Sequence, residues 1–491
     1  MRFLRRAIVV AVVMAGAAVA AADPDPGVRT ITGEIGRRLA IDTPAPVDRA
    51  RAPVSRTLYL ERCRGGCALT MGPNDARTNT TMLVLFANAT ISEFANSGSQ
   101  TGALADSEWN AIVQCMKEVY SPYDVEVTDQ KPPAGSSYHE AIIAGHPQEV
   151  GRTADILGVS PLANDCSAID NVISLTFANQ HSSPTPAART LSICWTAAQE
   201  SAHAYGLDHE YEFVVGKRSA CSDPMTYRSD CGGQKFFRNE PATCGENAPR
   251  ACKCGDAQNS HQKLLSVFGA GTPITRPPTV TMVDPAVGGA LPTVVEATAG
   301  AQRGVARVQL YLNGNKWAEH AGAAFGRNGQ PDPSNYEITV PADVPNSILD
   351  VKTVALDDLG VQAESATVTV TKGAPCATAA TCAKGQQCAN GRCFWDPPTA
   401  ELGDACEYAQ FCKSGVCQGS PQVCTQACIA GVADACPAAF DCVMTGPAAT
   451  DGLCEVQQGG GCCSVGGAGD GWAQLGIGAA ALAFAIRKRR R

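Results

Sequence analysis

The residues with the clearest chemical potential lie in one short stretch, 199 to 211, which reads QESAHAYGLDHEY. Gln199 and His203 are four residues apart, so on a helix their side chains share one face and can converge on one ion. Glu200 lies on an adjoining face, where its carboxylate could take a proton from a metal-bound water. This half of the stretch therefore predicts a helix that presents donor atoms and a base together.

The second half of the stretch predicts how a further donor reaches the same place. Gly206 allows the chain to leave the helix through a backbone conformation that is costly for other residues. The turn then brings His209 back toward the helix face. Donors at residues 199, 203 and 209 leave a fourth position for water, as a catalytic zinc requires.

A second signal begins soon after the histidines. Residues 222 to 227 read SDPMTY, and Met225 follows His209 by 16 residues. Together the two stretches resemble the metzincin zinc proteases, whose motif H-E-x-x-H-x-x-G-x-x-H is followed by a turn that carries a Met. Four of the five fixed motif positions match, and they are Glu200, His203, Gly206 and His209.

The resemblance implies a role for each matched residue. His203 and His209 would bind zinc, and Glu200 would act as the catalytic base. Met225 would underlie the metal site, and Tyr227 would lie near the oxyanion of the transition state. The substrate would be a protein or peptide, cleaved at its peptide bonds.

Gln199 departs from the family motif, which has His at this position. A Gln offers only a neutral amide oxygen, which suits zinc less well than imidazole does. Three alternatives follow: a protease relative that no longer turns over, a metal site completed by Gln199 or by another group such as His181 or Asp208, and a weak hydrolase. Zinc is thus the expected cofactor, bound weakly or not at all. The other histidines (His139, His146, His261 and His320) are expected at the surface.

Both ends of the chain carry sorting signals. Residues 1 to 22 have a basic start, an apolar run and small residues before Asp23, which is typical of a secretory signal peptide. Residues 455 to 491 combine a Gly and Cys462-Cys463 stretch, a short apolar segment and a terminal Arg cluster. This order resembles the MYXO-CTERM tail of myxobacterial surface proteins. It implies export, membrane attachment through the tail, and display at the cell surface or outer membrane, or release.

Charge and cysteine content agree with export. The chain has 39 Lys and Arg against 47 Asp and Glu, and eight of the basic residues belong to the two terminal signals. The part of the chain between these signals is therefore strongly acidic, which makes it a poor candidate for binding nucleic acid. The 24 Cys are more than a reducing cytosol normally sustains as disulfides.

Between the signals, the pattern predicts a multidomain chain. Residues 23 to 56 have no period and predict a linker or a propeptide-like arm. Residues 57 to 270 alternate strand and helix patterns, which predicts an α/β (α+β) domain. Its expected strands are Met82 to Ala87, Val125 to Val127 and Asn171 to Phe177; its expected helices are Ser107 to Tyr120, capped by Asp106, and Ala188 to Tyr205. Its ten Cys could form five disulfides, with Cys221 and Cys231 bracketing the Met225 turn.

Two further regions follow. Residues 274 to 373 contain no Cys, alternate apolar and polar residues, and have the turn pair Asn313-Gly314, so they predict an all-β region that resembles an immunoglobulin-like sandwich. Residues 376 to 454 hold twelve Cys in three groups of four and few large apolar residues, which predicts a disulfide-rich repeat region.

Two functions from different classes follow from these patterns. The first is an exported surface protein with a zinc metallopeptidase-like domain, impaired because of Gln199. The second is a non-catalytic adhesin or binding protein on a metzincin-like scaffold, with a surface ligand as its partner. The Gln at position 199 favours the second function, whereas Glu200, Met225 and Tyr227 favour the first.

Overall fold

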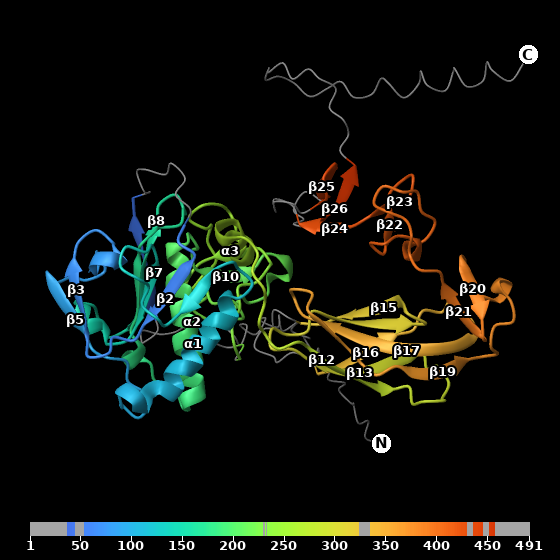
Figure 1. Cartoon of the computed structure of the whole chain (residues 1–491), viewed down its shortest axis with the longest axis horizontal. Coiled ribbons are helices and arrows are strands. Elements are labelled where there is room, and N and C mark those ends of the chain that lie inside the picture. Colours follow the sequence, from blue (N-terminus) through green and yellow to red (C-terminus); the bar gives the residue numbers. More distant parts are fainter. Residues whose placement is uncertain are drawn as a thin grey trace, which may run out of the picture. The chain divides into compact units, whose positions relative to one another are not determined.

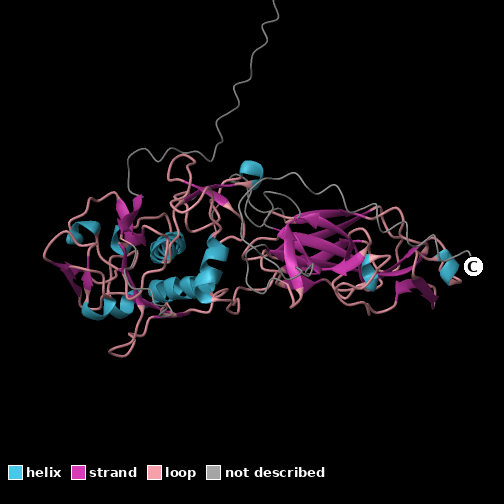
Figure 2. Ribbon diagram, turned by 90° about the horizontal axis from the view of Figure 1, so that it is seen from above, coloured by secondary structure: helices cyan, strands magenta, loops and turns pink. Residues whose placement is uncertain are grey.

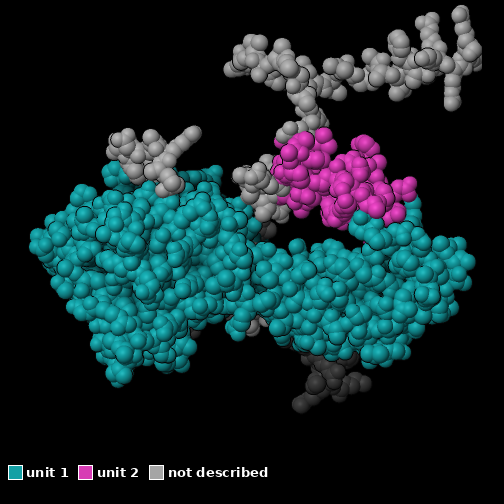
Figure 3. Space-filling view, viewed as in Figure 1, with its two compact units in different colours: residues 1–398 teal, residues 399–491 magenta. Residues whose placement is uncertain are grey.

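The computed structural model describes residues 37–44, 54–228, 231, 233–323, 334–429, 436–444 and 451–456. These residues form a multidomain, β-rich chain with few helices and a disulfide-rich C-terminal region. Two compact units divide the chain, residues 1–398 and 399–491, and Figure 3 colours them separately. The predicted signal peptide, 1 to 22, lies outside the described residues, as does the predicted tail beyond Val456.

A six-stranded sheet organises the first part of the chain, in the order β1-β8-β9-β7-β2-β6 (Figure 1). β8 runs antiparallel to β9, and the other neighbouring pairs are parallel. Every residue of β8 is buried, because helices cover one face and β1 covers its free edge. The strands are β1 (Arg37–Thr43), β2 (Thr57–Glu61), β6 (Glu126–Thr128), β7 (His139–Ile143), β8 (Ile156–Ala163) and β9 (Ile173–Thr176).

Three α-helices accompany this sheet: α1 (Asp106–Tyr120), α2 (Pro186–Ala204) and α3 (Ser260–Phe268). The helical spacing of apolar residues in α1 and α2 is confirmed, and α2 packs on β8 and β9. A disulfide between Cys115 and Cys194 joins α1 to α2. The end of α2 from Ala197 to Ala204 is buried on all sides, so the residues expected to do chemistry lie in the interior.

Short elements complete this region. The small sheets contain β3 (Cys67–Met71), β4 (Thr80–Thr81), β5 (Asn88–Ile91), β10 (Glu210–Phe213) and β11 (Ala242–Cys244). The 3-10 helices are η1 (Ala76–Thr78), η2 (Gly102–Ala105), η3 (Pro147–Val150), η4 (Ala178–Gln180) and η5 (Val215–Lys217). Five disulfides form in this region: Cys63–Cys67, Cys115–Cys194, Cys166–Cys254, Cys221–Cys231 and Cys244–Cys252. The expected bond across the Met225 turn is thus confirmed.

Three local expectations are wrong. Residues 82 to 87 form a turn, because Leu83 and Val84 are both buried while Leu85 and Phe86 are about half exposed, a pattern that strand alternation does not allow. The linker interpretation fails for residues 37 to 43, which form β1. Asp106 does not cap α1; it lies in the first turn and pairs with Arg62.

Two sheets pack face to face in the next region, as Figure 2 shows. Side chains of both sheets share one core, and the expected turn at Asn313-Gly314 has two positive φ angles, 49° and 84°. One sheet contains β12 (Thr279–Asp284), β13 (Val294–Gly300) and β16 (Asn335–Thr339). The other contains β14 (Arg307–Leu312), β15 (Asn315–Ala321), β17 (Ser347–Leu356), β18 (Gln362–Glu364) and β19 (Val368–Lys372).

A buried ion triad joins this sandwich to the sheet-and-helix region. The Asp358 carboxylate accepts hydrogen bonds from Arg303 at 2.6 Å and from Arg238 at 3.1 Å. All three side chains are at most 3% exposed. Arg238 also donates to the carbonyl of Ser222, at the start of the turn that carries Met225. The sandwich is therefore coupled to the segment next to the candidate site.

The three Cys groups share one pairing pattern, first with third and second with fourth. The bonds are Cys376–Cys388, Cys382–Cys393, Cys406–Cys417, Cys412–Cys424, Cys428–Cys442 and Cys436–Cys454. The elements are η6 (Ala379–Thr381), β20 (Gln386–Ala389), β21 (Arg392–Trp395), η7 (Ala409–Phe411), β22 (Val416–Gln418), β23 (Val423–Thr425), β24 (Ala427–Ile429), β25 (Phe440–Met444) and β26 (Asp451–Val456).

The first Cys group belongs to the first unit and packs on the sandwich. Arg392 pairs with Asp350 at 3.0 Å, and the rings of Trp317 and Trp395 lie 5.2 Å apart. Throughout the part of the chain that the structure describes, the helices are too short or too polar to span a bilayer.

Candidate functional site

The end of α2 and the turn after it bring the expected donors together. Gln199, Glu200 and His203 lie on α2 and are fully buried. Gly206 has φ +92°, and a Cβ there would lie 2.0 Å from the carbonyl oxygen of Cys166. Only glycine fits this exit from the helix, as the sequence predicted. The turn returns His209 to a buried position beside His203.

The two histidines face each other through their Nε2 atoms, which are 3.0 Å apart. His203 donates its Nδ1 hydrogen to the carbonyl of Leu207 at 2.7 Å, because a carbonyl can only accept. His209 likewise donates from Nδ1 to the Glu246 carboxylate at 2.9 Å. Each ring is therefore in the tautomer that leaves an Nε2 lone pair directed at the other ring.

Two lone pairs at this distance need a positive charge between them, either a proton or a metal ion. Two imidazole nitrogens on a tetrahedral zinc lie about 3.3 Å apart, since each bond is about 2.0–2.1 Å. The observed 3.0 Å is close to that spacing. Burial and the neighbouring His209 lower the pKa of His203 to about 3, so His203 is neutral at physiological pH. The pair therefore fits a divalent cation on these two donors.

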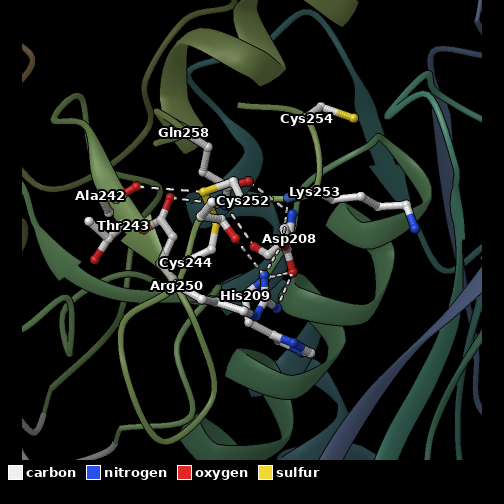
Figure 4. Close-up of a disulfide and its surroundings, with 12 residues drawn as sticks. Asp208, His209, Ala242, Thr243, Cys244, Arg250, Cys252, Lys253, Cys254 and Gln258 are labelled. Carbon is white, nitrogen blue, oxygen red and sulfur yellow. Dashed lines mark hydrogen bonds and ion pairs between the residues drawn. A yellow bond between two sulfur atoms is a disulfide. The ribbon is translucent and has the colours of Figure 1, made fainter. Parts of the chain in front are cut away.

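A network of hydrogen bonds and ion pairs fixes the Nδ1 side of the His209 ring (Figure 4). Arg250 forms two hydrogen bonds with the Asp208 carboxylate, at 2.6 and 2.9 Å, and a third with Glu246 at 2.7 Å. The hydrogen bond from His209, followed by that from Arg250, lowers the pKa of Glu246 and keeps its carboxylate charged. The Cys244–Cys252 disulfide, drawn in the same view, ties the two arms of this loop together. The Nδ1 partner of His209 is thus fixed in place.

Gln199 is the position at which the site departs from a three-donor shell. Its Oε1 accepts a hydrogen bond from Nη1 of Arg38 at 3.1 Å. Its Nε2 is buried, and no described residue offers it an acceptor. Arg38 belongs to β1, and its guanidinium also donates to the carbonyls of Thr226 and Tyr227. The amide oxygen of Gln199 is therefore committed to a guanidinium in this structure.

Glu200 is buried against the neighbouring strand. A Cβ at Gly158 of β8 would lie 2.4 Å from Oε1 of Glu200, so glycine makes the space for this carboxylate. Both carboxylate oxygens lack hydrogen-bond partners within the described ranges. Burial raises the pKa of Glu200 well above its usual range, although the positive charges of Arg38 and Arg152 oppose that rise. Its burial thus favours the protonated form of the Glu200 carboxyl.

Tyr227 packs beside the histidines, with its ring 4.7 Å from that of His209. Its hydroxyl accepts from the backbone N–H of Arg38 at 3.0 Å and donates to the carbonyl of the same residue. Burial raises the pKa of Tyr227 to about 12. Met225 is fully buried, and its N–H donates to Asp223 at 2.8 Å, which fixes the turn.

The two extra donors considered from sequence have other partners. His181 bonds through Nδ1 to Ser192 at 3.0 Å, while its Nε2 has no hydrogen-bond partner among the described residues; Asp208 pairs with Arg250. The expectation of surface positions is wrong for His139 and His261, which are 2% and 6% exposed. His139 bonds to Ser174 on the adjacent strand and His261 to the hydroxyl of Tyr123, so each replaces water with a protein partner. His146 and His320 are partly exposed.

A cavity of about 840 Å³ opens beside His209. β1 forms one wall through Arg37 to Ala40, and the loop from Glu246 to Lys253 forms another. Sequence reasoning missed Arg38, Gly158 and Glu246. Arg38 and Gln199 are 161 residues apart, and only the strand order brings them together.

Comparisons with known proteins leave the family open. No family model and no curated protein matches the chain. Among solved structures, fibronectin(III)-like modules of Clostridium thermocellum CbhA match at 21% identity, over 19% of this chain and 96% of theirs, with a TM-score of 0.15.

Two structures of OgpA from Akkermansia muciniphila also match, each over 68% of this chain and 95% of that one. The catalytically inactive form, in complex with an O-glycopeptide (glycodrosocin) substrate, has 8% identity and a TM-score of 0.18. The wild-type form has 12% identity and a TM-score of 0.17. All three TM-scores are low, so no argument about this chain rests on these likenesses.

Proposed function

We propose that this chain is an exported surface protein with a metzincin-like domain that binds zinc on His203 and His209 and acts weakly or not at all on peptides. One observation carries the proposal: two buried imidazoles direct Nε2 lone pairs at each other across 3.0 Å, and each Nδ1 is committed to an acceptor. The metzincin-like motif and the Met225 turn support the same reading.

Some residues of the site would bind the zinc ion, and others would transfer protons. His203 and His209 would hold the ion, and Leu207 and Glu246 fix the tautomers that this requires. A bound zinc supplies a water whose pKa is lowered toward about 7. Glu200 can receive a proton on its unpartnered carboxylate, and Tyr227 can donate from its hydroxyl to a carbonyl, as it now does to Arg38.

Zinc titration of the purified full chain tests this proposal. His203→Ala and His209→Ala should each abolish zinc binding by calorimetry, whereas His320→Ala in the sandwich should leave it unchanged. Binding that survives the loss of both histidines would overturn the proposal. Peptide cleavage by the wild type should be slow or absent, because Gln199 does not supply a third imidazole.

A second candidate function is a non-catalytic surface adhesin on the same scaffold. The hydrogen bond between Gln199 and Arg38 favours it, since a third ligand is then replaced by an internal contact. The sandwich and the Cys groups would in either case act as spacers or docking modules, resembling an immunoglobulin-like domain and small disulfide repeats. Complete absence of zinc from every variant would select this candidate.

A further inference from the structure

β1 contacts two of the residues that the sequence assigned to chemistry beside the histidines, Gln199 and Tyr227. Arg38 donates to Gln199 through its guanidinium, and its backbone N–H and carbonyl both bond to the Tyr227 hydroxyl. In the ladder between β1 and β8, Arg38 lies directly opposite Gly158, the residue that makes room for the Glu200 carboxylate. One residue thus bonds to both Gln199 and Tyr227 and is paired in register with the glycine beside Glu200.

A strand that only covers a sheet edge does not need a buried arginine, yet Arg38 is buried. Arg38 is 6% exposed, whereas the side chain of the adjacent Arg37 is 59% exposed and pairs with Asp155 at the surface. Burying a guanidinium is costly unless its donors are satisfied and its charge is balanced. Its Nη1 and Nη2 atoms donate to Gln199 and to two backbone carbonyls, whereas its Nε is buried without an acceptor among the described residues.

We propose that Arg38 is an internal plug of the candidate metal site: its guanidinium holds the cationic position beside the histidines, and Gln199 is the acceptor matched to it. This inference rests on the proposed function and extends it. A divalent cation ligated by residue 199 and the Arg38 guanidinium disfavour each other, because two positive charges on one buried amide oxygen repel strongly.

The pairing of β1 also indicates what the edge of β8 can bind. The present occupant is an extended strand that pairs with the edge of β8, and the Tyr227 hydroxyl bonds to its peptide group rather than to a side chain. Backbone recognition of this kind suits any extended polypeptide. The ligand class of this strand edge is therefore an extended peptide, and residues 37 to 43 of this chain are its intramolecular occupant.

Zinc affinity of full-length variants tests the plug. Arg38→Met keeps length and removes charge, so it should raise zinc affinity roughly tenfold or more over the wild type. Arg37→Met, on the same strand, is the matched control and should change affinity less than about twofold. Arg38→Lys keeps the charge and should stay near the wild type. Circular dichroism would verify that each variant folds.

Hydrogen exchange supplies a second readout. Because the repulsion is reciprocal, saturating zinc should speed exchange of the β1 amides in the wild type and leave β9 unchanged. Equal zinc affinity in the wild type and in Arg38→Met, still dependent on His203, would refute the plug and leave the metal site standing. Zinc binding in no variant, Arg38→Met included, would refute both.

Discussion

Replacing Asp358 with Asn should destabilise the first unit strongly at neutral pH. Asp358 is 2% exposed and accepts hydrogen bonds from two buried guanidiniums, those of Arg238 and Arg303. Burial alone would raise the pKa of Asp358, but Arg303 and then Arg238 lower it to about 2, against an ordinary value of 3.8. That difference corresponds to about 2.4 kcal/mol of unfolding free energy at pH 7.

The full cost can exceed this amount, because the variant leaves two buried cations without a balancing charge. Removing one partner of a buried ion pair costs about 3–5 kcal/mol. We therefore expect Asp358→Asn to lower the unfolding free energy by about 2–5 kcal/mol at pH 7. Arg238 also bonds to Ser222, so the turn that carries Met225 should exchange its amides faster in this variant.

The pH dependence gives the sharper test. The folded-state pKa lies below the unfolded value, so this stabilisation is present above about pH 4 and is lost as pH falls toward 2. The deficit of Asp358→Asn should shrink to about half at pH 3. Urea unfolding followed by tryptophan fluorescence would measure it, with the exposed Asp343→Asn as control. A loss of unfolding free energy below about 1 kcal/mol, or one that does not change with pH, would refute a stabilising role for the buried ion triad.

Three further predictions concern the sheet-and-helix region. Burial raises the pKa of Glu140 to about 7, so the stability that its protonated carboxyl contributes is lost as pH rises from about 4.5 through 7. Urea unfolding should therefore show that Glu140→Gln stabilises the fold by about 1–3 kcal/mol at pH 8 and has no effect at pH 4. Gly206→Ala should destabilise by about 2–4 kcal/mol in the same assay, since φ is +92° and the added Cβ would clash with Cys166; a cost below about 1 kcal/mol would contradict this geometry. Gln199→His should raise zinc affinity in calorimetry, because it adds an imidazole and removes the acceptor of Arg38. A further Glu200→Ala change should abolish any gained peptide cleavage while zinc stays bound. Unchanged affinity in Gln199→His would mean that residue 199 does not face the histidines.

The sequence predicted those parts of the site that local rules determine. The helix that carries His203, the glycine exit and the return of His209 all depend on residues within one stretch, so spacing alone was sufficient. The buried Met225 turn and its disulfide were predictable for the same reason.

The rest of the site depends on pairing between distant segments. Nothing in the sequence around Arg38 indicates that β1 would lie beside β8, because parallel pairing has no turn to mark it. The apolar residues 82 to 87 predict a strand, but the structure divides them between core and surface. Buried single histidines such as His139 carry no periodic signal at all.

The most direct test of the central claim is zinc-edge anomalous diffraction from crystals of the full chain and of its Arg38→Met variant, both grown with zinc. The account predicts one anomalous peak in the variant, about 2.1 Å from the Nε2 atoms of both His203 and His209, with residues 37 to 43 displaced or rearranged. The wild type should show a weaker peak at the same place. A variant in which the two Nε2 atoms stay about 3.0 Å apart, with zinc absent or bound elsewhere, would contradict the claim that these histidines form a metal site.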